Sequence, residues 1–319
     1  MNALPSRGGA VCIFPAETLY YADGGGGAVC MLIVGSPVFF HLARALRYAA
    51  ALPALAAVSL LTSCGVLDDI AEPEVIETEV RSPRLPEELD GFRIVLVTDL
   101  HENTRRSGAY LPRIVARMNL LRPDLIAIAG DFADGQAAEL AKRLEALRAL
   151  KAPYGVFGVA GNHEYYSDYN GFMALLPAVG VTMLENTHLM IHPSFAVAGV
   201  TDPAAYKRHL PVPDLAAALR GIPKDSFILL LAHRPQFFPA AAKQGVDLQL
   251  SGHTHGGLVL GFGPLLARSN GGFVAGLYRI GDSSLYVSRG TANWGVWRLG
   301  FHARLGIPSE ITLLVLRRP

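Results

Sequence analysis

From residue 91 onward, short apolar runs alternate with amphipathic stretches. Residues 111–121 and 140–150 repeat apolar side chains at helical spacing, which predicts two helices. Short β-rich runs lie at 93–98, 125–129, 156–160, 195–200, 227–232 and 247–250. Continuous apolar strands that alternate with amphipathic helices indicate a sheet covered on both faces.

The C-terminal part adds three further strand-like runs, at residues 272–280, 284–288 and 311–316. They are close enough in sequence to be antiparallel neighbours. The chain shows no internal repeat and no boundary for a second domain. We therefore predict one α/β domain over residues 91–319, built as a layered αββα sandwich.

The segment before residue 65 has a different composition. Residues 1–30 form an extension to which we assign no element, and residues 31–64 are nearly all apolar apart from a short stretch with Arg44 and Arg47. The apolar run ends in Leu61-Thr62-Ser63-Cys64. This ending resembles a signal peptide with a bacterial lipobox, in which the cysteine is lipidated and becomes the new N-terminus. Two other interpretations stay open, an uncleaved membrane anchor and a buried helix with an incidental cysteine.

The lipobox and the anchor would both attach the domain to a membrane. Arg44 and Arg47 lie ahead of the apolar run, which predicts a domain on the extracytoplasmic side. Residues 65–90 are acidic, contain several prolines and show no sustained helical period. We interpret them as a linker between the membrane-attached segment and the domain.

The charge balance and the cysteines narrow the kinds of site. Lys and Arg number 28 and Asp and Glu 27, a formal net charge of +1, so no nucleic-acid partner is expected. The three cysteines are Cys12, Cys30 and Cys64, which leaves the domain free of thiols. A disulfide framework, a thiolate metal site and a cysteine nucleophile are therefore excluded there. A metal ion in the domain must be bound by nitrogen and oxygen.

Polar residues concentrate where the predicted strands end. Five strands are followed by carboxylates, imidazoles or an amide, namely Asp99 and His101, Asp131, Asn162 and His163, His233, and His253 and His255. Because ligands bind at the carboxyl ends of strands in α/β sheets, we expect these side chains to meet in one crevice. Residues two apart in an extended segment project the same way. Asp99 with His101, and His253 with His255, are therefore each expected to reach one ion.

Asp131 follows the middle one of these strands and is the natural bridge between two ions. Glycines precede Asp131, Asn162 and His253, where they allow sharp turns and keep side-chain bulk away from the ions. Two ions about 3.5–4 Å apart would clamp a phosphoryl group and lower the pKa of a shared water, which gives a bridging hydroxide nucleophile at neutral pH. Imidazole and carboxylate ligands suit manganese, iron and zinc alike, so the identity of the two divalent metal ions stays open.

These five blocks resemble the signature of the calcineurin-like metallophosphoesterase superfamily, D-x-H, GD, GNH[DE], H and GHxH, in that order. The segments GHTHGG, LYRIG, LYVSRG and EITLL resemble its membrane-attached bacterial branch. The resemblance implies that one ion is held by Asp99, His101, Asp131 and His255, and the other by Asp131, Asn162, His233 and His253. It also implies that His163 is the catalytic histidine, which protonates the leaving oxygen, and that Glu164 orients it.

We expect the substrate to be a phosphomonoester, phosphodiester or pyrophosphate at a membrane surface, with lipid-linked phosphates favoured. A more specific alternative is a lipid A pathway UDP-diacylglucosamine-type pyrophosphatase, but that substrate is cytoplasmic, whereas Arg44 and Arg47 place the domain on the other side. A non-catalytic metal-binding scaffold is the third hypothesis, which the complete ligand set disfavours. Arg289 is the expected phosphate contact. Asp134 is expected to form a turn with Gly135, and a hydrogen bond to a ligand is its second interpretation.

Overall fold

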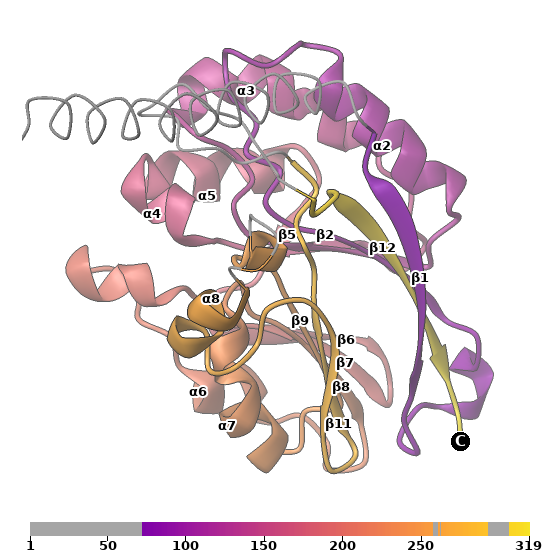
Figure 1. The fold of residues 1–319 in the computed structure, drawn as a ribbon. Coiled ribbons are helices and arrows are strands. Elements are labelled where there is room, and N and C mark those ends of the chain that lie inside the picture. Colours follow the sequence, from indigo (N-terminus) through magenta and orange to yellow (C-terminus); the bar gives the residue numbers. More distant parts are fainter. Residues whose placement is uncertain (1–71, 258–260, 262, 293–305) are drawn as a thin grey trace, which may run out of the picture. The chain divides into compact units, whose positions relative to one another are not determined.

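The computed structural model describes residues 72–257, 261, 263–292 and 306–319. Within them the strands form two six-stranded sheets, with helices on the outer side of each (Figure 1). The first sheet has the strand order β1-β12-β2-β3-β4-β5, and the second has the order β10-β11-β9-β8-β7-β6. The predicted αββα sandwich is thus confirmed.

The first sheet contains β1 (Glu74–Arg81), β2 (Arg93–Val97), β3 (Leu125–Ala129), β4 (Val156–Val159), β5 (Thr182–Met183) and β12 (Glu310–Arg317). The second contains β6 (Thr187–His192), β7 (Phe195–Gly199), β8 (Phe227–Leu231), β9 (Leu248–Ser251), β10 (Gly276–Ile280) and β11 (Ser283–Val287). The α-helices are α2 (Tyr110–Leu120), α3 (Ala137–Leu144), α4 (Asn162–Tyr166), α5 (Tyr169–Ala178), α6 (Leu215–Leu219), α7 (Phe238–Lys243) and α8 (Gly263–Ser269). Short 3-10 helices are η1 (Glu87–Leu89), η2 (Glu145–Ala149), η3 (Pro203–Lys207), η4 (Pro235–Phe237) and η5 (His255–Gly257).

The central strands are apolar on both faces because both faces are covered. In β2, Val95 belongs to the core shared with α2 and α3, whereas Ile94 belongs to the core between the two sheets. In β8, Leu229 faces the first sheet and Leu230 packs with residues of α6 and α7. Since β2, β3 and β4 run parallel, and β8 and β9 do too, their carboxyl ends are held at fixed positions by these buried layers.

The predicted elements agree closely with the observed ones in the first part of the domain. Strands β2, β3, β4, β7, β8 and β9 and helix α2 differ from their predicted ranges by no more than one residue at either end. The helix predicted over 140–150 is α3, which begins three residues earlier, followed by the 3-10 helix η2.

The prediction that the three C-terminal strands are neighbours is only partly right. β10 and β11 pair antiparallel in the second sheet, as expected. β12 instead lies in the first sheet, parallel to β1 and antiparallel to β2. Its first seven residues, Glu310–Leu316, are all buried, so this strand needs covered faces and paired neighbours on both sides, which the interior of the first sheet provides.

The predicted linker over residues 65–90 is wrong for β1 and η1, and the folded domain begins before Gly91. β1 pairs with β12 along its whole length. Its side chains alternate, with Ile76, Thr78 and Val80 half-buried or buried and their acidic neighbours exposed. This period of two is typical of a half-buried strand, and a search for helical spacing does not detect it.

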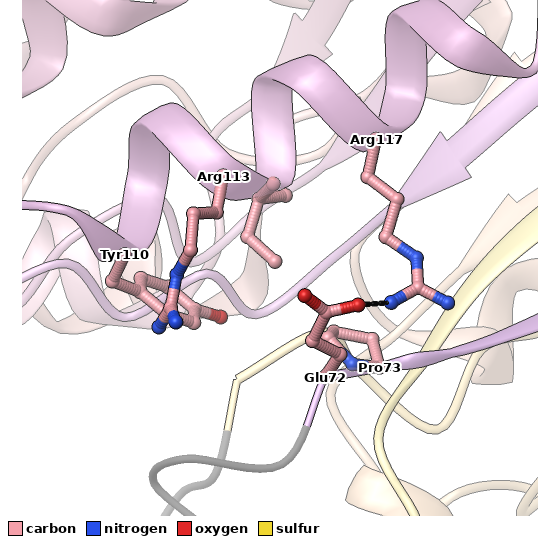
Figure 2. A pocket seen from close by; sticks show the side chains of 6 residues that line it. Glu72, Pro73, Tyr110, Arg113 and Arg117 are labelled. Atoms are coloured by element: carbon pink, nitrogen blue, oxygen red, sulfur yellow. Dashed lines mark hydrogen bonds and ion pairs between the residues drawn. The ribbon is translucent and has the colours of Figure 1, made fainter.

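The start of this segment is also attached to the domain. Glu72 forms an ion pair with Arg117 of α2, beside the side chains of Tyr110 and Arg113 (Figure 2). The hollow between these residues measures about 20 Å³, which is room for about one water and too small for a substrate. Its role is therefore structural.

Within the part of the chain that the structure describes, no helix is long and apolar enough to cross a membrane. The predicted signal peptide, lipobox or anchor at 31–64 and the extension at 1–30 lie outside the described residues. They stay predictions.

Candidate metal centre

One aspartate and two histidine side chains converge just after the C-terminal ends of β2 and β9. Asp99, His101 and His255 each offer a ligand atom, and these atoms lie within 4.8 Å of one another. His255 Nε2 is 3.4 Å from Asp99 Oδ1 and 3.4 Å from His101 Nε2. Two bare imidazole nitrogens cannot both accept at that distance without something positive between them, so this arrangement fits a shared cation.

A second group lies just after the C-terminal ends of β3, β4, β8 and β9. Asp131, His233 and His253 offer ligand atoms within 4.8 Å of one another. His233 Nε2 lies 3.3 Å from Asp131 Oδ2, 3.2 Å from Asn162 Oδ1 and 3.2 Å from His253 Nδ1. All donors are nitrogen or oxygen, a set that suits manganese, iron or zinc.

One oxygen connects the two groups. Asp131 Oδ2 is 3.3 Å from His233 Nε2 in the second group and 3.8 Å from His101 Nε2 in the first. The other oxygen, Oδ1, accepts a hydrogen bond from the backbone N–H of His163 at 2.9 Å, which fixes the carboxylate. The side chain is therefore oriented to serve both groups at once.

Hydrogen bonds at the outer nitrogens set the tautomers of two predicted ligand histidines, His233 and His101. His233 Nδ1 donates to the carbonyl oxygen of Ala129 at 2.8 Å, and His101 Nδ1 donates to Asp134 Oδ1 at 3.0 Å. Each Nε2 is thus the ring nitrogen that points into the centre, and it offers a lone pair there when the ring is neutral. This is the usual way in which proteins orient metal-binding imidazoles.

The electrostatics of the second group favour a positive charge. Burial lowers the pKa of His233, but the Asp131 carboxylate beside it raises that pKa to about 10. Burial and the neighbouring His233 hold the pKa of His253 well below its usual range, so His253 is neutral and free to donate a lone pair. The residues present therefore fit a bound cation.

The backbone at the predicted ligands is strained. Asp99, His101, Asp131, His253 and His255 have positive φ values of 52°, 42°, 53°, 70° and 48°, in the left-handed region that non-glycine residues seldom adopt. Such strain persists only where the surroundings impose it, and it concentrates at functional sites. Here the N–H groups of Asp99 and His101 are tied to the carbonyls of Gly130 and Asp131, at 3.0 and 3.1 Å.

This finding corrects the reasoning from spacing. The pairs Asp99 with His101 and His253 with His255 were expected to lie on extended segments, with both side chains on one side. The segments are left-handed turns, and only the first pair shares a group. Asp99 and His101 lie together with His255, whereas His253 lies with Asp131 and His233, so the expectation that His253 and His255 reach one ion is wrong.

The glycines of the motifs are required by close approach. A Cβ atom on Gly161 would lie 2.2 Å from Asp131 Oδ1, and one on Gly252 would lie 2.4 Å from Asp99 Oδ2. A Cβ atom on Gly130 would lie 2.5 Å from His233 Nδ1. All three distances are well inside van der Waals contact, so any side chain here would push a predicted ligand aside.

His163 lies beside the two groups and not within either ligand set proposed above. Its Nε2 atom is 4.0 Å from Asp131 Oδ2, and its Nδ1 atom is 2.6 Å from Asp134 Oδ1. Burial lowers the pKa of His163, but the Asp131 and Asp134 carboxylates raise it to about 9. The imidazole therefore carries a proton at neutral pH, as a proton donor must.

Two carboxylates beside His163 differ from expectation. Asp134 contacts both His163 and His101, so its second interpretation, a hydrogen bond to a ligand, is the observed one. Glu164 does not orient His163. Its buried carboxylate accepts hydrogen bonds from four backbone N–H groups, those of Asp131, Phe132, Ala133 and Gly161. Burial and the nearby Asp131 charge raise the pKa of Glu164, to about 8.

The structure places the side chain of Arg289 on acidic partners. Its Nε donates to Glu310 Oε2 at 2.5 Å, and its terminal nitrogen lies 3.2 Å from Glu74 Oε2. Its Cγ atom would lie 2.9 Å from a Cβ on Gly256, directly after the predicted ligand His255. Arg289 thus borders the loop that carries a predicted ligand.

A family model described as calcineurin-like phosphoesterase matches residues 92–257. The chain is 34% identical over 277 residues to a Danio rerio protein named transmembrane protein with metallophosphoesterase domain, an alignment that covers 83% of this chain and spans 62% of that protein's length. It is 30% identical over 256 residues to an uncharacterized metallophosphoesterase of Bacillus subtilis, over 77% of this chain and 87% of that protein. The solved structure of the Bacillus subtilis calcineurin-like phosphoesterase YfkN aligns with 71% of this chain and 81% of its own, at 16% identity and a TM-score of 0.41.

Proposed function

This chain belongs to the calcineurin-like phosphoesterase family, and from that premise we propose that it hydrolyses phosphoester bonds with two divalent metal ions. The observation that carries the proposal is the position of Asp131 Oδ2, which faces a histidine of each group, at 3.3 and 3.8 Å. Bound there, two ions would polarise the phosphoryl oxygens and lower the pKa of a shared water.

We propose that each ion is held by four side chains. Asp99, His101, Asp131 and His255 would hold one ion, and Asp131, Asn162, His233 and His253 the other. His101 and His233 use their outer nitrogens for fixed hydrogen bonds, so only Nε2 remains for an ion. The buried hydrogen bonds of Glu164 keep the turn after Asp131 in one conformation.

His163 is proposed to donate a proton to the leaving oxygen. The imidazole is charged at neutral pH, and Asp134 holds its Nδ1, which leaves Nε2 to face the reacting group. Because the same Asp134 oxygen also holds His101, it keeps the proton donor at a fixed distance from the first ligand group. Asp134 is thus a positioning residue for two neighbours.

We also propose a location at a membrane surface and a lipid-linked phosphate or pyrophosphate as the substrate. Support comes from the apolar run at 31–64 and from the word transmembrane in the name of the Danio rerio relative. Arg289 is proposed to contact the substrate phosphate after parting from Glu74, its exposed partner. A UDP-diacylglucosamine-type pyrophosphatase stays the alternative, and a non-catalytic scaffold is disfavoured because every proposed ligand is present.

Two experiments test these proposals. Metal analysis of the purified full-length chain, followed by assays of a monoester, a diester and a pyrophosphate with manganese, iron or zinc, should show about two ions and metal-dependent hydrolysis. A protein that binds no ion, or that hydrolyses none of the three, would contradict the activity. Labelling of cells with a fatty-acid analogue should mark the wild type and not Cys64→Ala. An unlabelled soluble protein that prefers free nucleotides to lipid phosphates would contradict only the membrane proposal.

A further inference from the structure

A pocket of about 490 Å³ opens beside the proposed proton donor. His163 and Asp134 form part of its wall, and the rest comes from the loop after His101, the start of α3 and the end of α4. Its volume lies within the range of small-molecule sites, about 300–1,000 Å³. A phosphoryl group alone needs far less room, so the pocket has space for an organic group attached to it.

The chemistry of His163 indicates which part of a substrate would lie here. A general acid must be within hydrogen-bond reach of the oxygen that it protonates, and here that oxygen belongs to the leaving group. Whatever borders His163 is therefore continuous with the leaving group. The transferred phosphoryl group has to lie toward the two ligand groups instead.

The side chain of Tyr166 offers this pocket an aromatic face. Tyr166 is 55% exposed, and its ring centroid is 5.8 Å from that of His163. The ring packs against the imidazole of His163, whose Nδ1 is held by Asp134 at 2.6 Å. An exposed ring on a rigid support suits stacking against a flat group.

Charged groups complete the wall. Arg105 lines the pocket, and within the described residues its guanidinium makes no hydrogen bond or ion pair. An arginine available in this way suits an anionic group. Glu139, which is exposed and also lines the pocket, can accept hydrogen bonds from hydroxyl groups.

We infer that this pocket binds the leaving group of the substrate, and that this group combines a flat ring with an anionic group, as a nucleoside monophosphate does. The inference rests on the proposed phosphoesterase function. It specifies a substrate with a large leaving group on Tyr166 and Arg105, and it disfavours simple alkyl monoesters.

The step balances for a nucleoside diphosphate used as a probe. The oxygen of water bonds to the terminal phosphorus, and the anhydride bond breaks with its electron pair going to the leaving oxygen. That oxygen receives the proton of His163, and a proton lost by the water restores His163. The products are inorganic phosphate and the nucleoside monophosphate.

Three substrates that transfer the same phosphoryl group separate the two contacts. ADP has a leaving group with both ring and charge, phenyl phosphate has the ring only, and inorganic pyrophosphate has the charge only. Phosphate release by the full-length chain measures all three. Intrinsic reactivity cancels when each variant is compared with the wild type.

We expect Tyr166→Leu to lower kcat/KM for ADP and phenyl phosphate about tenfold more than for pyrophosphate, in line with the loss of one stacked ring. Tyr166→Phe should retain the wild-type pattern because the ring remains. Arg105→Ala should lower kcat/KM for ADP and pyrophosphate several-fold more than kcat/KM for phenyl phosphate, and Arg105→Lys should restore most of that loss. Tyr206→Leu and Arg113→Ala remove exposed side chains outside the pocket and serve as matched controls.

A binding measurement gives a second readout that needs no turnover. In equilibrium dialysis, AMP should bind the wild type more tightly than inorganic phosphate does, and Tyr166→Leu should abolish the difference. The inference is overturned if AMP binds no tighter than phosphate, or if Tyr166→Leu slows all three substrates equally. It is also overturned if kcat/KM for ADP and phenyl phosphate falls as much in Tyr166→Phe as in Tyr166→Leu. Failure of the proposed function looks different, because the wild type would then hydrolyse none of the three substrates.

Discussion

Replacing Asp131 with asparagine tests the two-metal centre at its shared ligand. The substitution keeps the size of the side chain, and the amide oxygen can still accept the 2.9 Å hydrogen bond from His163 N–H. What is lost is the anionic Oδ2, which lies 3.3 Å from His233 Nε2 and 3.8 Å from His101 Nε2. Both proposed ions lose a ligand and a negative charge, while the turn itself is preserved.

The expected effect on catalysis is large. A metal ion supplies several kcal/mol of transition-state stabilisation, and each 1.36 kcal/mol corresponds to a tenfold change in rate. A loss of about 4 kcal/mol gives roughly a 10³-fold decrease in kcat. The fold should survive, because β3 is paired with β2 and β4 and buried on both faces.

Three measurements on purified wild type and Asp131→Asn decide the outcome. Inductively coupled plasma mass spectrometry gives the metal content, circular dichroism gives the fold and the melting temperature, and hydrolysis of bis(p-nitrophenyl) phosphate gives kcat. Asp225→Asn changes an exposed aspartate outside the centre and is the matched control. If Asp131→Asn kept two bound ions and near wild-type turnover, the shared-ligand assignment would be refuted.

Three further predictions concern the proton donor, a glycine and a structural ion pair. His163→Ala should lower kcat about 10²–10⁴-fold with metal content unchanged, and metal loss in step with activity would make His163 a ligand instead. Gly252→Ala places a Cβ 2.4 Å from Asp99 Oδ2 and should lower activity roughly 10²-fold and weaken metal binding. Gly108→Ala is the control, because a Cβ there meets open space and should change neither activity nor metal binding. Equal activities of the two variants would show that the close approach at Gly252 does not matter. Asp247→Asn weakens a buried carboxylate that accepts from Arg84 Nε at 2.9 Å, and calorimetry should show about 2 kcal/mol of destabilisation, roughly 4–8 °C in Tm, with an unchanged Tm refuting the role of the pair.

The candidate site could be predicted to a large degree because its residues follow strands. Asp99, Asp131 and His233 come directly or one residue after apolar runs that are recognisable in the sequence. Parallel strands end at a common edge, so their flanking residues meet whatever the intervening helices do. The left-handed turns after the strands then set the distances between the predicted ligand atoms.

The partners of two carboxylates near the predicted ligands, those of Glu164 and Asp134, could not be predicted in this way. Glu164 was expected to orient His163, but it binds the backbone of the turn after Asp131, whereas Asp134 contacts His163 and His101. Glu164 lies in α4 and Asp134 in the loop after β3, both within three residues of a predicted ligand, and sequence distance does not tell which one reaches an imidazole. The acidic residue three positions after Asp131 was the available signal, and a turn with Gly135 was an equally local explanation.

The sequence by itself determined the local pattern of this protein: nine of the strands, helix α2 and the order of the predicted ligand blocks, because apolar period and strand-end polarity are properties of short segments. Only the tertiary structure decided the long-range pairings. β1 is a strand because β12, more than two hundred residues later, lies beside it. β12 belongs to the first sheet, although the strands that precede it in sequence, β10 and β11, belong to the second. The left-handed turns at Asp99, His101, Asp131, His253 and His255 were decided in the same way, since non-glycine residues adopt positive φ only when surrounding contacts offset the strain.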